Sequence, residues 1–216
     1  MLRVFTTAGG EGGNPLGVFL DGAAVPPEER QAVATDLGFS ETVFVDDAAT
    51  GAVRIFTPST ELAMAGHPLV GTSWLLARER TAIDVLRPPA GEVPTWSEDG
   101  VVWIRGRPEW APDFVLREAG SAQEVEDLPG PPPGEGLIDV WAWIDEPGGV
   151  VRSRVFPPDL GIEEDEATGA AALRLGAHLA RPIEIHQGRG SELLARPGPA
   201  GTVEVGGRVA LDEVRE

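Results

Sequence analysis

The chain contains no cysteine among its 216 residues. Disulfide bonds, thiolate metal sites and cysteine nucleophiles are therefore excluded. Any acid or base chemistry must come from carboxylates or from histidine.

Basic residues are scarce, with 17 Lys and Arg against 35 Asp and Glu and a formal net charge of −18. Nucleic acids and anionic membrane surfaces are bound through clustered Lys and Arg, which this chain does not show. We therefore expect a small-molecule partner, with no nucleic acid and no membrane. The chain shows no basic-then-apolar leader. It also shows no apolar run near the length of about 18 residues that a membrane span needs. The cytoplasm is therefore the expected location.

Histidine is also rare, and the three copies, His67, His178 and His186, are not at metal-ligand spacing from one another. We expect no metal and no other cofactor. The glycine loop at residues 8–15 departs from the dinucleotide pattern G-x-G-x-x-G, because Pro15 stands where the third glycine is required. No Ser-His-Asp set can be argued from spacing, so nucleophilic hydrolysis has no support.

The most informative stretch runs from Arg54 to Leu76 and reads RIFTPSTELAMAGHPLVGTSWLL. An alternating, strand-like piece turns through Gly66-His67-Pro68 into an apolar helix. Proline suits the first helical position, so the helix is predicted to begin at Pro68 with Gly66 and His67 beside its unpaired N–H groups. Such a helix start predicts an anion site. Because the helix has no polar face before Arg78, it must be enclosed, and a curved sheet is the expected enclosure.

A second copy of this pattern lies 100 residues further on, where Arg154 to Leu175 reads RVFPPDLGIEEDEATGAAALRL. A strand again leads through a proline turn to a glycine-containing helix start at Thr168-Gly169. Two repeats are too few for a solenoid. We therefore predict two similar domains facing across one cleft, at residues 1–110 and 111–216.

Two carboxylates stand out by position. Glu41 shares one face of a predicted strand with Val43 and Val45. It is either an exposed residue at a strand edge or a carboxylate held in an apolar pocket for proton transfer at neutral pH. Asp165 is either a cap or dipole partner at a helix start, or a functional residue that takes the place opposite His67 in the second copy of the repeat. His67 itself is either a structural histidine at a helix cap or part of the anion site.

Short motifs in order along nearly the whole chain resemble the phenazine biosynthesis PhzF-like isomerases. In the first half these motifs are Val4-Phe5-Thr6, Gly13-Asn14-Pro15, Phe39-Ser40-Glu41-Thr42, Arg54-Ile55-Phe56-Thr57-Pro58, Glu61-Leu62, Ala65-Gly66-His67-Pro68 and Gly71-Thr72. The second half supplies Arg154, Phe156, Pro158, Gly161-Ile162, Glu164-Asp165, Ala167-Thr168-Gly169, Ala170-Ala171 and Gln187-Gly188.

The resemblance implies an α+β fold of the diaminopimelate epimerase type, with two half-barrels each wrapped round a central helix, assembled as a homodimer. By analogy Glu41 is the acid/base, while His67 and Asp165 position and polarise the substrate. The substrate-binding positions are expected at the two helix starts, namely Gly66, Thr168, Gly169 and Ala170. Relatives in the wider fold use two cysteines as opposed bases, and that chemistry is impossible here.

Three features depart from the family. Ala170 stands where the family usually has serine, Glu166 replaces the usual proline, and the second domain is shortened. The leading hypothesis is a cofactor-independent isomerase that shifts a proton within a small carboxylate, with Glu41 as the shuttle. The alternative is a small-molecule binding protein of the same fold that has lost turnover.

Overall fold

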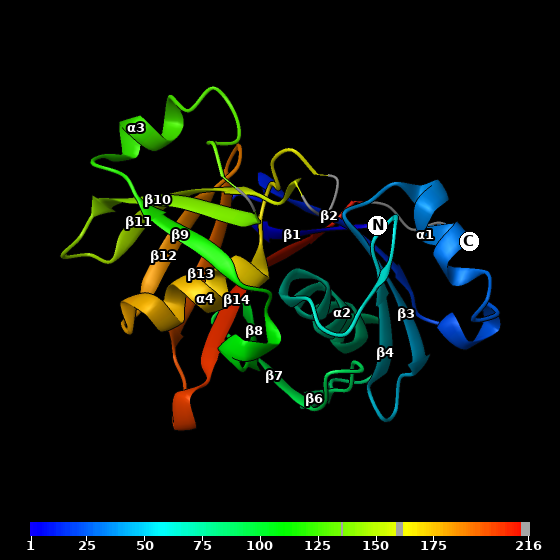
Figure 1. Ribbon diagram of the computed structural model, residues 1–216. Helices are drawn as coiled ribbons and strands as arrows, with labels where there is room; N and C mark the ends of the chain where they lie inside the picture. Colours follow the sequence, from blue (N-terminus) through cyan, green and yellow to red (C-terminus); the bar gives the residue numbers. More distant parts are fainter. Residues whose placement is uncertain (135, 159–161, 213–216) are drawn as a thin grey trace.

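The computed structural model describes residues 1–134, 136–158 and 162–212. The predicted α+β class is confirmed, since a mixed sheet curls round central helices (Figure 1). The helices are α1 (Arg30–Leu37), α2 (Gly66–Glu79), α3 (Ala122–Glu126) and α4 (Gly169–Leu179). The strands are β1 (Leu2–Thr6), β2 (Gly12–Phe19), β3 (Glu41–Asp47), β4 (Ala52–Phe56), β5 (Glu61–Leu62), β6 (Val85–Leu86), β7 (Val93–Glu98), β8 (Val101–Gly106), β9 (Phe114–Glu118), β10 (Leu137–Asp145), β11 (Val150–Phe156), β12 (Ile183–Gln187), β13 (Ser191–Pro197) and β14 (Val203–Leu211).

The strands pair in the order β5-β4-β3-β2-β1-β14-β13-β12-β11-β10-β9, and β8 leaves this path by pairing with β14. Strand β14 therefore belongs to both halves of the molecule. It pairs with β1, where Leu2 lies opposite Leu211, and with β8, where Val203 lies opposite Gly106. It also pairs with β13, where Pro197 lies opposite Val203. The proposed division at residue 110 stays a prediction, and its second range includes residues 135, 159–161 and 213–216, which lie outside the described residues.

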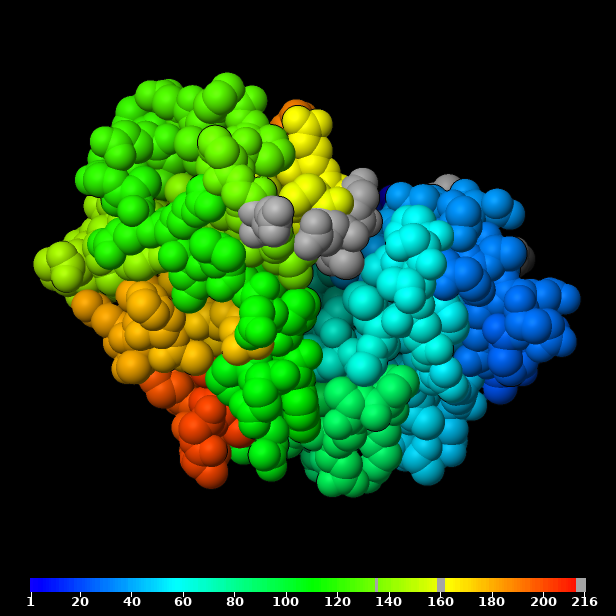
Figure 2. All heavy atoms as spheres, in the orientation of Figure 1, coloured from blue at the N-terminus to red at the C-terminus, as the bar shows by residue number. Residues whose placement is uncertain are grey.

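Both halves contain the same hairpin between a central helix and a small outer helix. In the first half, β3 and β4 pair so that Thr42 lies opposite Phe56. In the second half, β10 and β11 pair so that Ile138 lies opposite Phe156. Helix α1 covers the outer face of the first hairpin and α3 that of the second, each over a small apolar cluster. Figure 2 shows the first half, coloured from blue to green, beside the second half, coloured from green to red.

Helix α2 is enclosed, as its apolar sequence predicts. Leu69, Val70 and Leu76 are fully buried against the inner faces of the strands, together with Val43 and Val45. Burying each such side chain contributes about 1.5–3 kcal/mol relative to exposing it. The ribbon diagram shows α2 surrounded by β1, β3, β4, β7 and β8 (Figure 1).

The predicted start of this helix was wrong by two residues. The helix begins at Gly66, so that Pro68 is its third residue rather than its first. The proline is tolerated because the first four N–H groups of a helix have no partner within the helix. None of the helices among the described residues combines the length and hydropathy needed to cross a bilayer.

Candidate active site

The first turns of α2 and α4 touch each other backbone to backbone. A Cβ atom added to Gly169 would lie 2.8 Å from the backbone nitrogen of His67, and one added to Gly66 would lie 3.0 Å from Cα of Gly169. Any side chain at either glycine would push the two helices apart. The structure thus brings Gly66, Gly169 and the neighbouring Ala170 to one place.

Neither helix start is capped by the side chain of its preceding residue, Ala65 or Thr168. Free N–H groups and the positive ends of two helix dipoles therefore converge. A carboxylate or phosphate is the ligand that such a pair of helix starts favours.

Glu41 lies beside the first of these helix starts. It is the first residue of β3, and its Oε2 lies 3.0 Å from Nδ1 of His67. The two side chains are largely buried, at 17% and 3% exposure. Of the two interpretations of Glu41, the enclosed carboxylate fits and the exposed strand edge does not.

Two polar atoms of this pair have no hydrogen-bond partner within the described structure. They are Oε2 of Glu41, which lies near the imidazole but out of hydrogen-bonding alignment, and Nε2 of His67. A buried polar atom left without a partner costs about 1–3 kcal/mol. The side chain of Glu41 and the backbone of Pro15 also contact the imidazole and raise the pKa of His67, so a polar ligand group would compete with these contacts.

The imidazole of His67 responds to two carboxylates. Its burial alone would lower its pKa, but the charge of Glu41, the contact with that side chain and the charge of Asp165 outweigh burial. The pKa of His67 is therefore raised above its ordinary value. Ionised carboxylates at both positions favour the imidazolium form.

Asp165 comes from the segment before α4 and faces the same site. Its backbone N–H donates to the carbonyl of Val155 at 2.9 Å, which ties the segment to β11. Burial and the charge of Glu41 raise the pKa of Asp165 to about 6, while hydrogen bonds from Thr168 and Asn14 and the charge of His67 act against them. The three predicted residues therefore form one electrostatically linked group.

Asn14 also lies at the site, although the motif Gly13-Asn14-Pro15 by itself predicts no role for it. Its Nδ2 donates to Oδ1 of Asp165 at 2.8 Å and to the carbonyl of Ala167 at 3.0 Å. Its Oδ1 accepts from Oγ of Ser40 at 2.9 Å. Asn14 is only 1% exposed. A lone amide in an otherwise apolar strand marks this position in the sequence, but the sequence does not indicate its partners.

Gln187 is the second residue without an assigned role. Its Oε1 accepts from the backbone N–H of Thr168 at 3.1 Å, and its Nε2 donates to the Asp165 carbonyl and to Oγ1 of Thr168, both at 2.9 Å. Because Oγ1 of Thr168 accepts this bond, its own proton is free to donate to Oδ2 of Asp165 at 2.6 Å. Thr168 thus holds Asp165, and its role in substrate binding stays a prediction.

No group of three His, Asp or Glu side chains in residues 1–134, 136–158 and 162–212 is arranged to hold a metal ion.

An apolar pocket of about 380 Å³ exists, but it lies at the opposite end of α2, where Leu75 and Glu79 line it together with Phe19 and Leu37. The chemical features described above all lie at the helix starts, so we place the candidate site there and not in that pocket.

Comparison with known proteins agrees with the earlier resemblance. The profile of the family described as phenazine biosynthesis-like protein matches residues 2–103. The trans-2,3-dihydro-3-hydroxyanthranilate isomerase of Pseudomonas fluorescens is 30% identical over 84% of this chain and 80% of its own length. The enzyme of the same name from Pseudomonas aeruginosa is 33% identical over the same shares of the two chains.

Solved structures share the fold. A Clostridium difficile structure described as a phenazine biosynthesis PhzC/PhzF protein superposes with a TM-score of 0.78 at 18% identity, over 98% of this chain and 95% of that one. A PhzF-family protein of Bacillus anthracis gives 0.71 at 20% identity, over 97% and 94% of the two chains. The chain therefore belongs to the phenazine biosynthesis-like family and is a PhzF-like isomerase.

Proposed function

We propose that this isomerase shifts a proton between two carbons of a small cyclic carboxylate without a cofactor, with Glu41 as the acid/base. The observation that carries the proposal is the pair formed by Glu41 and His67, whose unpartnered atoms lie beside two uncapped helix starts. A proton acceptor and an anion site are thus held within one small region.

In the proposed step, the Glu41 carboxylate removes a proton from a substrate carbon. The electron pair of that C–H bond moves into the conjugated system, and the protonated Glu41 returns the proton to a different carbon. Atoms and electrons balance, and no redox partner is needed. Negative charge that develops toward the substrate carboxylate during the transfer is stabilised by the N–H groups of the helix starts.

His67 and Asp165 have supporting roles in this proposal. The imidazolium of His67 orients Glu41 through the contact at 3.0 Å and can donate from Nε2 to the substrate. Asp165 favours the charged form of His67. The names of the relatives support a cyclic amino carboxylate as the substrate class.

One observation favours the alternative, a binding protein that has lost turnover. Ala170 supplies no hydroxyl at the second helix start, where the family resemblance implies serine. A site that only binds would retain the helix starts without needing Glu41 as a base. The family resemblance also leads us to propose a homodimer in the cytoplasm, which light scattering and cell fractionation would test.

A screen of small cyclic and amino carboxylates in deuterated water tests the proposed function. An isomerase of this kind incorporates deuterium into its substrate during turnover, because Glu41 exchanges its proton with solvent. Compounds that bind without any deuterium incorporation across the whole screen would favour the binding protein.

A further inference from the structure

The turn between β12 and β13 lies directly behind Asp165. Gln187 ends β12 and pairs with Ser191, which begins β13. Because Gln187 bonds both the Asp165 carbonyl and Thr168, the placement of this turn determines where Asp165 is held.

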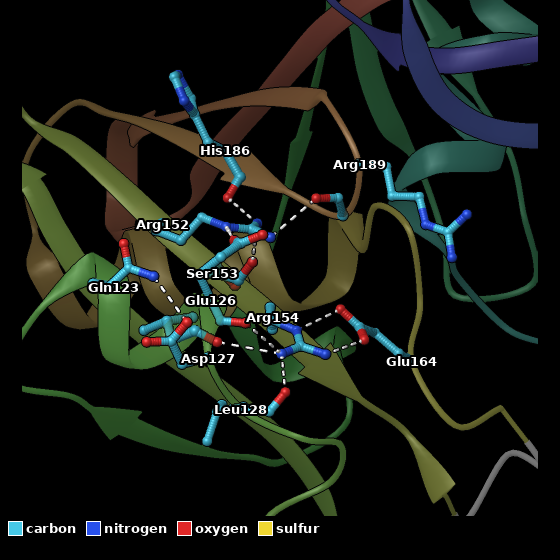
Figure 3. A network of polar contacts seen from close by, with 12 residues as sticks. Gln123, Glu126, Asp127, Leu128, Arg152, Ser153, Arg154, Glu164, His186 and Arg189 are labelled. Carbon is cyan, nitrogen blue, oxygen red and sulfur yellow. Dashed lines mark hydrogen bonds and ion pairs between the residues drawn. The ribbon is translucent and has the colours of Figure 1, made fainter.

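One side of the turn is held by Arg152. Its guanidinium donates to the carbonyl of His186 at 2.9 Å and to that of Gly188 at 3.0 Å (Figure 3). It also forms an ion pair with Glu126 at 2.7 Å. These bonds satisfy carbonyl groups but leave the N–H groups of the turn for other partners.

The other side is held by Glu166, the residue next to Asp165. Its Oε1 accepts from the backbone N–H of Arg189 at 2.8 Å and from Oγ of Ser191 at 2.9 Å. A Cβ atom on Gly188 would lie 2.4 Å from Oε2 of Glu166, so only glycine lets the turn approach this carboxylate.

The Ser191 hydroxyl extends this contact to the first half of the molecule. Ser191 is fully buried, and its Oγ accepts the N–H of Gly13 at 3.0 Å while donating to Glu166. Gly13 precedes Asn14, whose amide donates to Asp165. Glu166 is therefore linked by hydrogen bonds to the two segments whose side chains hold Asp165. We call these segments the Gln187 arm, which Glu166 contacts at Arg189, and the Asn14 arm, which it reaches through Ser191 and Gly13.

We propose that Glu166 is a positioning residue, whose carboxylate fixes the Asn14 and Gln187 arms and through them the carboxylate of Asp165. The inference rests on the proposed function, in which Asp165 acts on His67. A proline at this position, as the family resemblance implies, could accept none of these side-chain hydrogen bonds. This chain thus uses a hydrogen-bonding carboxylate at a position where the resemblance implies a rigid backbone.

The test compares Glu166→Ala with Glu166→Gln, which keeps an acceptor oxygen but not the charge. Glu163→Ala is the matched control, because Glu163 is an exposed acid of the same segment. Amide hydrogen exchange at Gly13 and Arg189 reports on the two arms, and an NMR titration of the labelled Asp165 carboxyl reports on its placement. Neither measurement requires a substrate.

In Glu166→Ala, we expect about tenfold faster exchange at the Arg189 amide, which loses its acceptor, and a smaller increase at the Gly13 amide, whose acceptor Ser191 loses its own partner. We also expect the pKa of Asp165 to rise, because the bonds from Asn14 and Thr168 that lower it are weakened. Glu166→Gln should remain close to wild type in both measurements.

An Asp165 titration in Glu166→Ala that matches Glu163→Ala would overturn the positioning role. A similar rise in the pKa of Asp165 in Glu166→Gln would also overturn it, because glutamine keeps the acceptor oxygen and the loss of a neighbouring negative charge would lower that pKa. A wild-type protein without deuterium incorporation would instead count against the proposed function, while these titrations would still decide the role of Glu166.

Discussion

The two halves of the molecule share one scaffold but carry different side chains at equivalent positions. In the paired hairpins, Thr42 lies opposite Phe56 and Ile138 lies opposite Phe156, which makes Glu41 the counterpart of Leu137.

The segments after the hairpins show a second difference. Ile55 lies opposite Leu62, and Val155 lies opposite Asp165, so that Asp165 is the counterpart of Leu62. At the helix starts, Gly66 matches Gly169 and His67 therefore matches Ala170.

What the halves retain in common is structural. Arg54 pairs with Glu61 and Arg154 pairs with Glu164, in each case joining the hairpin to the segment that leads toward the central helix. What differs is the chemistry. Each half supplies one carboxylate and has leucine where the other half has its acid, so neither half could form the site alone.

The largest effect is expected from Asp165→Asn, which removes the carboxylate that the second half supplies. The pKa of Asp165 is raised to about 6 from an ordinary value of 3.8, so its contribution to stability is fully present below about pH 4 and is lost as the pH rises through 6. A shift of this size corresponds to up to about 3 kcal/mol. Asp165→Asn should flatten the pH dependence of the unfolding free energy between pH 4 and 6, as measured by urea denaturation. An unchanged pH dependence would show that Asp165 does not titrate in this range.

The second prediction concerns Gly169→Ala, which should push the two equivalent helix starts apart. Gly169→Ala places a Cβ atom 2.8 Å from a backbone nitrogen that cannot rotate away. We expect a loss of roughly 1–3 kcal/mol of unfolding free energy and weaker binding of a carboxylate identified in the screen, measured by denaturation and by calorimetry. Gly9→Ala is the control, because its new Cβ would have its nearest neighbour at 3.6 Å. Equal stability of the two variants would mean that the helix starts can separate freely.

The third prediction concerns Asn14, whose side chain links the first half to Asp165 and Ala167 of the second half. Asn14→Ala removes the partly buried hydrogen bond to Asp165 and the buried one to the Ala167 carbonyl. We expect a loss of about 1–2 kcal/mol in unfolding free energy and a higher pKa for Asp165. Thr7→Ala on the neighbouring exposed loop provides the comparison. If the pKa of Asp165 were the same in both variants, the link through Asn14 would have no influence on the site.

The smallest expected effect is at Ala170, the counterpart of His67. Ala170 is only partly buried, so Ala170→Ser should change the unfolding free energy by less than about 1 kcal/mol. Its relative affinity for different cyclic carboxylates should change more than its stability. A stability loss of several kcal/mol would show that the position belongs to the packed core.

The enclosed helix α2 and the repeated strand-turn-helix pattern could be predicted from the sequence, because each depends on local periodicity, whereas the α+β class followed from the family resemblance. It also named Glu41, His67 and Asp165, which the structure brings together, although their roles stay predictions. The roles of Asn14, Gln187 and Glu166 could not be predicted, because their partners are set by tertiary packing.

Asp139 illustrates the same limit. It lies in β10, yet nothing in the strand pattern indicates that it is fully buried with a hydrogen bond from Oγ of Ser153 at 2.6 Å. Burial raises the pKa of Asp139 to about 7, although the hydrogen bond from Ser153 acts against it. Period-2 alternation identifies a strand face, but it cannot identify the side chain that faces a residue from another strand.

The most direct test of the central claim is solvent exchange by Glu41→Gln, the variant that removes the acid of the first half while keeping its size. Glu163→Gln is the matched control on an exposed acid. With a substrate identified in the screen, Glu41→Gln should lose roughly 10²–10⁴-fold in deuterium incorporation while substrate binding is largely kept, because glutamine cannot accept the proton. Deuterium incorporation by Glu41→Gln at the wild-type rate would contradict the assignment of Glu41 as the proton shuttle.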